Sequence, residues 1–366
     1  MRRRAPQVAL LSVALAASAC SVDRPIGHAD AGLGVLTDST STDSATANAM
    51  RRAFLAATPT RGARRPLDFS RASGNPTPLQ LITSLPVIQP WALAMNTSGI
   101  ALVSSLGLNN VTFIDVPSAR ILGTAPTGGL PTDIALTADG NTAYVANQDG
   151  TLTVLDVNTR QVLRTLTIPS TAVLCVAVSA TTGAVYAGDG NGFVSRLDPI
   201  SGAILAQSSV GSLPNGLVVN PAGSRVYVTN THGGQFVELD ATTLAPTRPT
   251  IFIGGVVQDI AISPAGDRAV VANETGFLSD VNLLTGGVVN IPTAGGAFGL
   301  VTSPAAFSLI GVTGPNLGYQ VYQVSLGQLR PPFAQIRGGL RRGGYHPATR
   351  WIAVTNTWNS TVDLFR

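Results

Sequence analysis

The residues best placed to do chemistry in this sequence are two carboxylates and one guanidinium. Asp133, Asp259 and Arg342 stand at the same position of a unit that recurs every 40 to 43 residues. Polar groups that converge in a mostly apolar cleft are typical of binding sites. The three side chains could bind a small polar ligand, a divalent cation or a side chain of a partner. With a metal ion, the two carboxylates could also support metal-dependent hydrolysis.

Other catalytic residue types are sparse and badly spaced. After residue 78 the sequence has two histidines, His232 and His346, which are about 114 residues apart and lack the H-x-x-x-H spacing of a metal site. There is no G-x-S-x-G motif, and "GGLRRGG" lacks the strand-to-helix context of a phosphate-binding loop. Cys175 stands in the apolar run "AVLCVAVS" with no basic neighbour, which predicts a small buried hydrophobic residue and not a nucleophile.

The elements that must position these residues are short β-strands in repeated units. "NTAYVANQDG", "SRVYVTNTHGG" and "DRAVVANETG" show the repeat, which also appears at "RWIAVTNTWN". Each unit has an apolar run, a turn, the quoted strand and two further strands. Anchored on "PTDIALT", the unit starts are Pro90, Pro131, Val173, Pro214, Val257, Ala297 and Leu340.

Turn residues recur for backbone reasons. Glycines stand where the first hairpin needs a positive φ: Gly140, Gly183, Gly223 and Gly266. Asparagines that suit a side-chain-bonded turn close the second strand: Asn147, Asn230, Asn273 and Asn356. Aspartates followed three residues later by Ser or Thr cap the third turn: Asp115, Asp156, Asp198 and Asp240. Recurrence of this kind indicates structure, not catalysis.

The repeat predicts an all-β fold, a seven-bladed β-propeller of four-stranded antiparallel blades over residues 79–366. The composition agrees, because the chain has 39 Gly, 24 Pro and no Lys, and is only 11% charged. The seventh unit ends at Arg366 without a fourth strand, whereas "PLQLITSLPV" at 78–87 resembles one. We therefore expect the N-terminal strand to complete the last blade, since an open edge would expose unpaired backbone.

Aligning the starts of the innermost strands predicts the residues around the central channel. The Asp133 position holds Ala92, Asp133, Cys175, Gly216, Asp259, Gly299 and Arg342, and the preceding position holds Trp91, Thr132, Leu174, Asn215, Gln258, Phe298 and Arg341. The candidate binding residues at the channel mouth are Asp133, Asp259, Arg342, Asn215, Trp91 and Phe298. A structural ion-pair cluster filling the channel, with the aromatic residues as core, explains the same pattern.

"YVTN" at 227–230 and "YVAN" at 144–147 resemble the YVTN-type repeats of seven-bladed propellers from bacterial and archaeal surface-layer and exported proteins. The resemblance covers residues 79–366 and is weakest in the sixth unit, which has lost its glycine turn. It implies fold and export more than activity, because propellers host unrelated functions. Similar propellers include lactonases and lyases, which use His, Glu and metal-binding carboxylates around the channel. That resemblance leaves open an enzyme whose metal ligands would be Asp133 and Asp259.

The N-terminus predicts export. "MRRR", the apolar run "VALLSVALAA" and the small residues before Cys20 form a signal peptide over residues 1–19. Cys20 at this place resembles the lipobox cysteine of bacterial lipoproteins, although Ala17 replaces the usual Leu. We expect a lipidated Cys20, a flexible tether over 20–78 and an outer-membrane anchor; conventional cleavage, giving a periplasmic or secreted protein, is the alternative.

Charge argues against nucleic acid as a partner. Residues 1–78 hold ten Arg and five acidic residues, whereas 79–366 hold 13 Arg and 14 acidic residues. The predicted propeller therefore lacks the basic footprint that nucleic-acid binding needs. We expect a monomeric, non-catalytic scaffold of the cell envelope, without a required cofactor, that binds an envelope protein or polysaccharide. Trp358 is either an exposed anchor for such a partner or a packed residue of its blade.

Overall fold

The structure is a computed structural model that divides the chain into two units, Met1–Ser73 and Gly74–Arg366. It describes residues 80–211, 213–293, 295–303, 308–313, 319–325, 328–329, 334–336 and 340–366. The expected signal peptide, Cys20 and the whole of the expected tether lie outside the described residues. The account below therefore concerns the second unit.

The described part of this unit is built from antiparallel sheets. The first sheet contains β2 (Pro90–Met95), β3 (Ile100–Ser105), β4 (Asn110–Asp115) and β5 (Arg120–Pro126). The second contains β6 (Pro131–Leu136), β7 (Thr142–Asn147), β8 (Thr151–Asp156) and β9 (Gln161–Thr167). The third contains β10 (Val173–Val178), β11 (Val185–Asp189), β12 (Phe193–Leu197) and β13 (Ile204–Ser209). Two more are β14 (Pro214–Val219), β15 (Arg225–Asn230), β16 (Gln235–Asp240) and β17 (Ile251–Phe252); and β18 (Val257–Ile262), β19 (Arg268–Asn273), β20 (Phe277–Asn282) and β21 (Val288–Pro292).

Two sheets differ from this simple order. One contains β22 (Ala297–Ser303), β23 (Ser308–Thr313), β24 (Tyr319–Ser325), β25 (Gln328–Leu329) and β26 (Ala334–Ile336), with both β25 and β26 paired to β24. The other contains β27 (Leu340–His346), β28 (Trp351–Asn356), β29 (Thr361–Phe365) and β1 (Leu81–Pro86). Among the described residues, six sheets therefore have four strands and one has five. The prediction of four-stranded antiparallel blades is confirmed for those six, and the expected count of seven such blades is corrected at β22–β26, where the repeat pattern had drifted.

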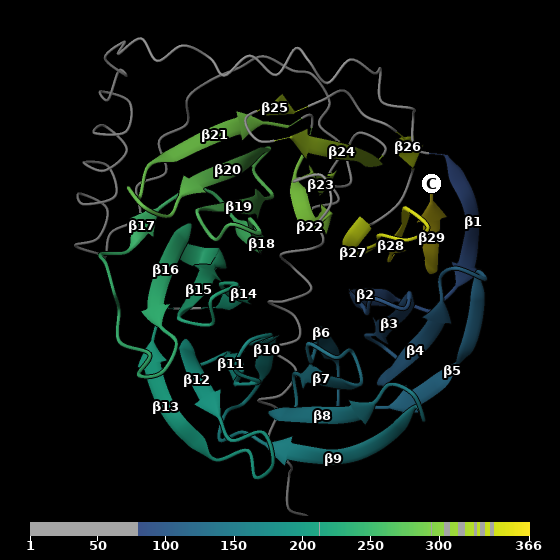
Figure 1. Ribbon diagram of the computed structural model, residues 1–366, viewed down its shortest axis with the longest axis horizontal. Coiled ribbons are helices and arrows are strands. Elements are labelled where there is room, and N and C mark those ends of the chain that lie inside the picture. Colours follow the sequence, from purple (N-terminus) through teal and green to yellow (C-terminus); the bar gives the residue numbers. More distant parts are fainter. Residues whose placement is uncertain are drawn as a thin grey trace, which may run out of the picture. The chain divides into compact units, whose positions relative to one another are not determined.

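The sheets are arranged radially around a common centre, like the blades of a propeller (Figure 1). The innermost strands contact one another in a closed circuit, in the order β2, β6, β10, β14, β18, β22, β27 and back to β2. Each of these strands begins at the residue that the sequence repeat predicted.

The ring closes as the sequence predicts. β1 pairs antiparallel with β29, with Pro86 opposite Thr361 and Leu85 opposite Val362. The N-terminal strand is thus the outermost strand of the sheet formed by the C-terminus. This pairing covers the edge of β29 that would otherwise expose unpaired backbone groups.

The hydrophobic core lies between neighbouring sheets. One cluster joins Leu102 and Phe113 of the β2–β5 sheet to Val145 and Leu155 of the β6–β9 sheet. Middle strands such as β3 and β7 are buried along nearly their whole length, whereas the outermost β5 and β9 are largely exposed. Strands covered on both faces need continuous apolar runs, which explains why the middle strand of each repeat was the clearest in sequence.

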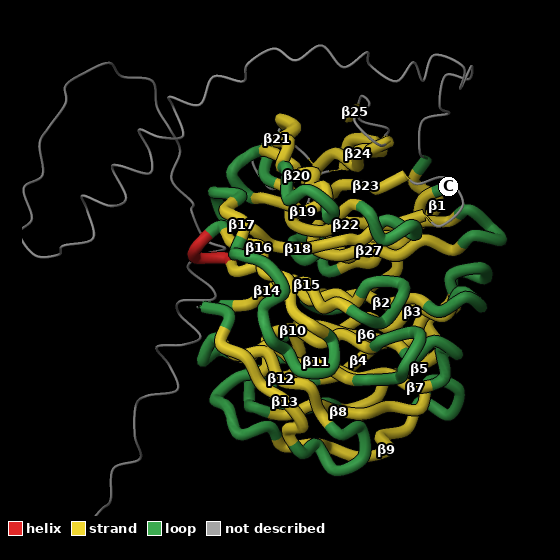
Figure 2. The backbone as a smooth tube through the Cα atoms, turned by 60° about the vertical axis from the view of Figure 1, so that its left-hand side comes forward, coloured by secondary structure: helices red, strands yellow, loops and turns green. Residues whose placement is uncertain are grey.

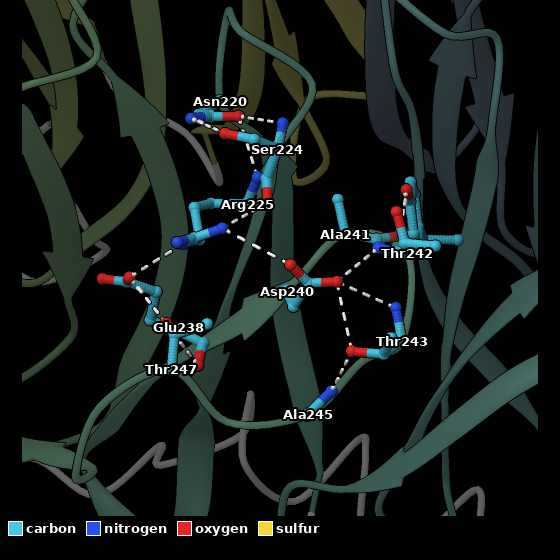
Figure 3. Close-up of polar contacts among 11 residues, drawn as sticks. Asn220, Ser224, Arg225, Glu238, Asp240, Ala241, Thr242, Thr243, Ala245 and Thr247 are labelled. Carbon is cyan, nitrogen blue, oxygen red and sulfur yellow. Dashed lines mark hydrogen bonds and ion pairs between the residues drawn. The ribbon is translucent and has the colours of Figure 1, made fainter.

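The predicted turn chemistry is present. Gly140, Gly183, Gly223 and Gly266 have φ between 69° and 71°, which glycine adopts without strain. The carboxylate of Asp240 accepts hydrogen bonds from the backbone N–H groups of Thr242 and Thr243 at 2.9 Å (Figure 3). Asn282 makes the same turn in the β18–β21 sheet, a position that a search for aspartate alone misses.

A buried carboxylate supports the four-stranded sheet whose fourth strand is the shortest. β17 has two residues, and the chain before it is held by Glu238, which forms ion pairs with Arg225 at 3.4 Å and Arg248 at 2.7 Å. Glu238 also accepts a hydrogen bond from Thr247 at 2.7 Å (Figure 3). These side chains hold the segment 241–250 where the other sheets use strand pairing.

One short 3-10 helix, η1 (Thr231–Gly233), appears within the described residues and is drawn in red in Figure 2. In the part of the chain that the structure describes, we find no helix with the length and apolar character needed to cross a bilayer.

Candidate functional site

The candidate site begins with an irregularity shared by the innermost strands. Each of them carries a shift in its pairing register near its first residues, as between Pro131 and Asp133 or between Leu340 and Gly343. A β-bulge of this kind bends the strand and redirects its side chains, and bulges are frequent beside functional sites. The two positions that the sequence alignment assigned to the channel mouth fall within or beside these bulges.

Threonine hydroxyls hold two of the bulges in place. The buried Thr229, the Thr of "YVTN", accepts a hydrogen bond from Gly216 N–H at 3.0 Å and donates to the carbonyl of Gln258 at 3.1 Å. Thr355 accepts from Arg342 N–H at 2.9 Å and lies 3.0 Å from the carbonyl of Trp91. The threonine at this position of the repeat, Thr229 in one unit and Thr355 in another, therefore connects neighbouring sheets.

A cavity of about 280 Å³ occupies the channel. Four of the six predicted site residues line it: Asp133, Asn215, Asp259 and Arg342. The rest of its wall is glycine, alanine and branched aliphatic residues, including Leu93, Leu136, Val178, Val219 and Leu300. The structure thus brings the two carboxylates and the guanidinium into one cavity.

Arg342 and Asp259 form an ion pair in this cavity, with side-chain exposures of 15% and 17%. Burial alone would lower the pKa of Arg342, but the negative charges of Asp259 and Asp133 outweigh burial and raise it. Arg342 therefore remains charged and neutralises one of the two carboxylates.

Both carboxylates also bind backbone of the neighbouring sheet. Asp133 Oδ2 accepts a hydrogen bond from Val176 N–H at 3.0 Å, and Asp259 Oδ2 accepts one from Leu300 N–H at 2.9 Å. Burial raises the pKa of Asp133 to about 6, although Arg342 and the Val176 hydrogen bond lower it. The two aspartates therefore stabilise contacts between innermost strands in addition to facing the cavity.

Trp91 and Phe298 do not line the cavity; their rings enclose another arginine. The guanidinium carbon of Arg341 lies 4.7 Å from the Trp91 ring centroid and 4.4 Å from that of Phe298. Such stacking is a favourable cation–π arrangement. The three residues come from β2, β22 and β27, so the stack joins three successive sheets of the ring.

A carboxylate that the sequence analysis missed lies near this stack. Asn215 donates to Gln258, and Gln258 donates to Glu274. Burial raises the pKa of Glu274 to about 7, while the charge of Arg341 and the Gln258 hydrogen bond lower it. Glu274 directly follows the asparagine that closes β19, at the end of the blade where the innermost strands begin. That position in each repeat is the sequence signal that could have identified it.

The histidines do not join this site. His232 lies in η1, and His346 is buried at the end of β27. The ring of His346 contacts Thr349 Oγ1 at 2.8 Å through Nδ1 and the carbonyl of Thr97 at 3.2 Å through Nε2, so it joins the last sheet to the first.

Cys175 is fully buried and forms no disulfide. Its Sγ lies 3.5 Å from the carbonyl oxygen of Pro214. Burial and the charge of Asp133 raise the pKa of its thiol. A thiol in this environment stays protonated at neutral pH and is a poor nucleophile.

The donor set fits a divalent cation poorly. Across the described residues, no group of three or more His, Cys, Asp or Glu side chains is placed to hold a metal ion. Asp133 and Asp259 would be the ligands, but Arg342 already supplies a positive charge beside Asp259. A second cation with two charges would be repelled by the guanidinium.

No protein-family model and no curated protein sequence matches this chain. Three solved structures have a similar fold. Kuenenia stuttgartiensis hydrazine synthase is 14% identical with a TM-score of 0.67, and the match covers 78% of this chain and 97% of that chain. The β-propeller domain of Cps50 (Swd1) from Myceliophteria thermophila is 11% identical with a TM-score of 0.65 (79% and 99% covered), and a chain of a mitotic checkpoint complex is 16% identical with a TM-score of 0.67 (85% and 97% covered). At these identities the likeness shows the fold alone, a β-propeller.

Proposed function

We propose that this protein is an exported, lipid-anchored β-propeller that binds a protein partner in the bacterial cell envelope without catalysis. In this proposal the sheet β22–β26 counts as the sixth of seven blades, and the repeat belongs to the YVTN type. The signal-peptide pattern of residues 1–19 and the position of Cys20 support export and lipidation.

The observation that carries the binding function is an exposed apolar patch where the ring closes. Ile88, Leu108 and Trp358 are 56%, 49% and 57% exposed. We call these three residues the seam patch. Large apolar side chains grouped on a surface mark interaction sites more often than single ones do, and tryptophan is enriched among residues that dominate binding energy.

Hydrogen bonds hold the three loops of the seam patch together. Val87 N–H donates to the carbonyl of Ser360 at 3.0 Å, and Leu106 N–H donates to the carbonyl of Gln89 at 3.1 Å. Thr357 Oγ1 donates to the carbonyl of Pro90 at 2.7 Å. The loops 87–89, 106–109 and 357–360 therefore form one surface on a fixed backbone, which lowers the entropy cost of binding a partner.

The channel residues favour binding over catalysis. Asp259 is paired with Arg342, and both aspartates accept backbone hydrogen bonds, so their positions serve the contacts between sheets. Neither histidine faces them as a general base. One of the similar folds comes from a structure named as a complex, which agrees with a binding role.

A photo-crosslinking experiment in the producing cells tests the proposal. A photoreactive amino acid at position 358, and separately at 108, should capture one and the same envelope protein. The control positions are Ile200 and Leu284, which are 70% and 82% exposed but lie on turns at the opposite end of their blades. Equal capture at the control positions, or no capture at 358 and 108, would refute the seam patch as the binding surface.

Export and lipidation are tested separately by mass spectrometry of the N-terminal peptide from membrane fractions. A diacylglyceryl-modified Cys20 is the expected result, and a Cys20→Ala variant should leave the membrane. An unmodified N-terminus after another residue would instead indicate the conventionally cleaved, periplasmic or secreted protein.

A further inference from the structure

We propose that the channel cavity binds an alkylammonium group, the chemistry carried by a small aliphatic amine or by a lysine side chain. The proposal is independent of the seam patch, because it rests on the charge balance and the wall of the cavity. It adds a ligand site to a propeller whose binding surface is on the loops.

The charge balance of the cavity wall is the first step. Asp133, Asp259 and Arg342 are the charged residues that line it. Arg342 pairs with Asp259, whereas Asp133 has a backbone N–H as its direct partner. The lining therefore carries one negative charge in excess, and a buried carboxylate without a paired cation is costly. A ligand with a single positive charge would remove that cost.

The apolar wall is the second step. The lining includes Leu136 on β6, Val178 on β10 and Val219 on β14. Each stands three residues after the position of its strand that aligns with Asp133, on a strand that runs along the channel. These aliphatic residues lie at the edge of the cavity and also pack against the cores between the sheets. An alkyl chain next to the ammonium group would bury its methylene groups there, at about 0.8 kcal/mol per CH₂.

The polar groups beside Asp133 favour an ammonium ion over a divalent cation. An ammonium has three N–H donors and no acceptor. The side-chain acceptors of the lining residues are the carboxylates of Asp133 and Asp259 and the amide oxygen of Asn215, whose nitrogen donates to Gln258. A metal ion with two charges would exceed the single charge that the cavity needs.

Calorimetry and thermal melts of the purified protein with n-butylammonium test the proposal. The melting temperature should rise with n-butylammonium, and n-butanol and butyrate should give no comparable rise. Asp133→Asn keeps an oxygen that can accept from Val176 N–H but removes the excess charge, so it should weaken n-butylammonium binding at least about tenfold. Equal stabilisation by butyrate, equal binding by the variant, or no binding of n-butylammonium to the wild type would overturn the proposal.

A second variant keeps the test informative if Asp133→Asn folds poorly. Val178→Phe leaves every charge in place and fills part of the apolar wall, so it should also weaken n-butylammonium binding while methylammonium binding changes less. Unchanged n-butylammonium binding in this variant would place the ligand outside the cavity. Short peptides with lysine or norleucine at one position then distinguish the two sources of the alkylammonium group. If the lysine peptide binds and the norleucine peptide does not, the ligand is a lysine side chain of a partner. If n-butylammonium binds and neither peptide does, the ligand is a small amine.

Discussion

The guanidinium of Arg342, on β27, contacts the carboxylate of Asp259, on β18, although the sheet that begins with β22 lies between theirs in the ring. The pair therefore connects sheets that share no strand pairing. It places a positive charge inside the channel and leaves Asp133 as the carboxylate without a paired cation. The electrostatics of the candidate site follow from this one contact.

Removing one member of this ion pair should destabilise the ring. Arg342→Met leaves the partly buried Asp259 without its cation, and we expect a loss of about 3 kcal/mol in the free energy of unfolding. The double variant Arg342→Met, Asp259→Leu should recover most of that loss because no charge is left unpaired. Urea denaturation measures both. A single variant as stable as the wild type would mean that water already screens the pair.

Closure by β1 should control the stability of the whole ring. Deleting residues 79–87 exposes the edge of β29 and removes Val87, which is buried against Ile114 and Leu364, so we expect a melting temperature at least about 10 °C lower. Differential scanning calorimetry measures the change. The matched control replaces the exposed Leu81 and Ile82 by Thr, keeps the strand and should shift stability by less than about 0.5 kcal/mol. An unchanged melt in the deletion would contradict the closure.

Buried carboxyl groups should make stability fall as pH rises through the slightly acidic range. Burial raises the pKa of Asp133 to about 6 and of Glu274 to about 7, so the folded state holds these protons more tightly than the unfolded state does. Their stabilising effect is complete below the unfolded pKa values near 4 and is lost as pH rises through 6 to 7.

The measurement is urea denaturation from pH 4.5 to 7.5 on the wild type, Asp133→Asn and Glu274→Gln. Both variants should show a flatter dependence than the wild type. Asp139→Asn is the control with the opposite sign, because hydrogen bonds from Thr137 and Asn141 lower the pKa of Asp139, whose stabilising effect is therefore lost at acid pH. A wild-type profile that rises through pH 6 to 7, and is unaltered by the two variants, would contradict the assignment.

The threonine of the "YVTN" strand should contribute through its hydroxyl and not through its shape. Thr229→Val removes the acceptor of Gly216 N–H and the donor to the Gln258 carbonyl while keeping the side-chain volume, which should cost about 1–3 kcal/mol. Thr229→Ser keeps the hydroxyl and is the matched control. Chemical denaturation of the two variants separates hydrogen bonding from packing, because Val keeps the methyl group and Ser keeps the hydroxyl. A loss in Thr229→Ser as large as the loss in Thr229→Val would show that packing of the methyl group matters as much as the hydroxyl and would contradict the prediction.

Local sequence patterns were sufficient for the strands and turns. The innermost strands begin at the predicted residues, and the units of β6, β14 and β18 carry the full succession of apolar run, glycine turn and asparagine. These signals act within one repeat, where the backbone alone requires them. The pattern failed at β22–β26, where the unit has no glycine turn and the sheet has five strands.

The sequence by itself determined the repeat, the antiparallel blades and the strand that closes the ring, because alternation and turn chemistry are local properties. It also placed Asp133, Asp259 and Arg342 at one level of the channel. Only the tertiary structure decided that Arg342 pairs with Asp259, that Arg341 lies between Trp91 and Phe298, and that hydrogen bonds join the loops carrying Ile88, Leu108 and Trp358. These partners are separated by up to about 270 residues in the chain, and ring closure brings them together, so no local pattern encodes which side chains meet.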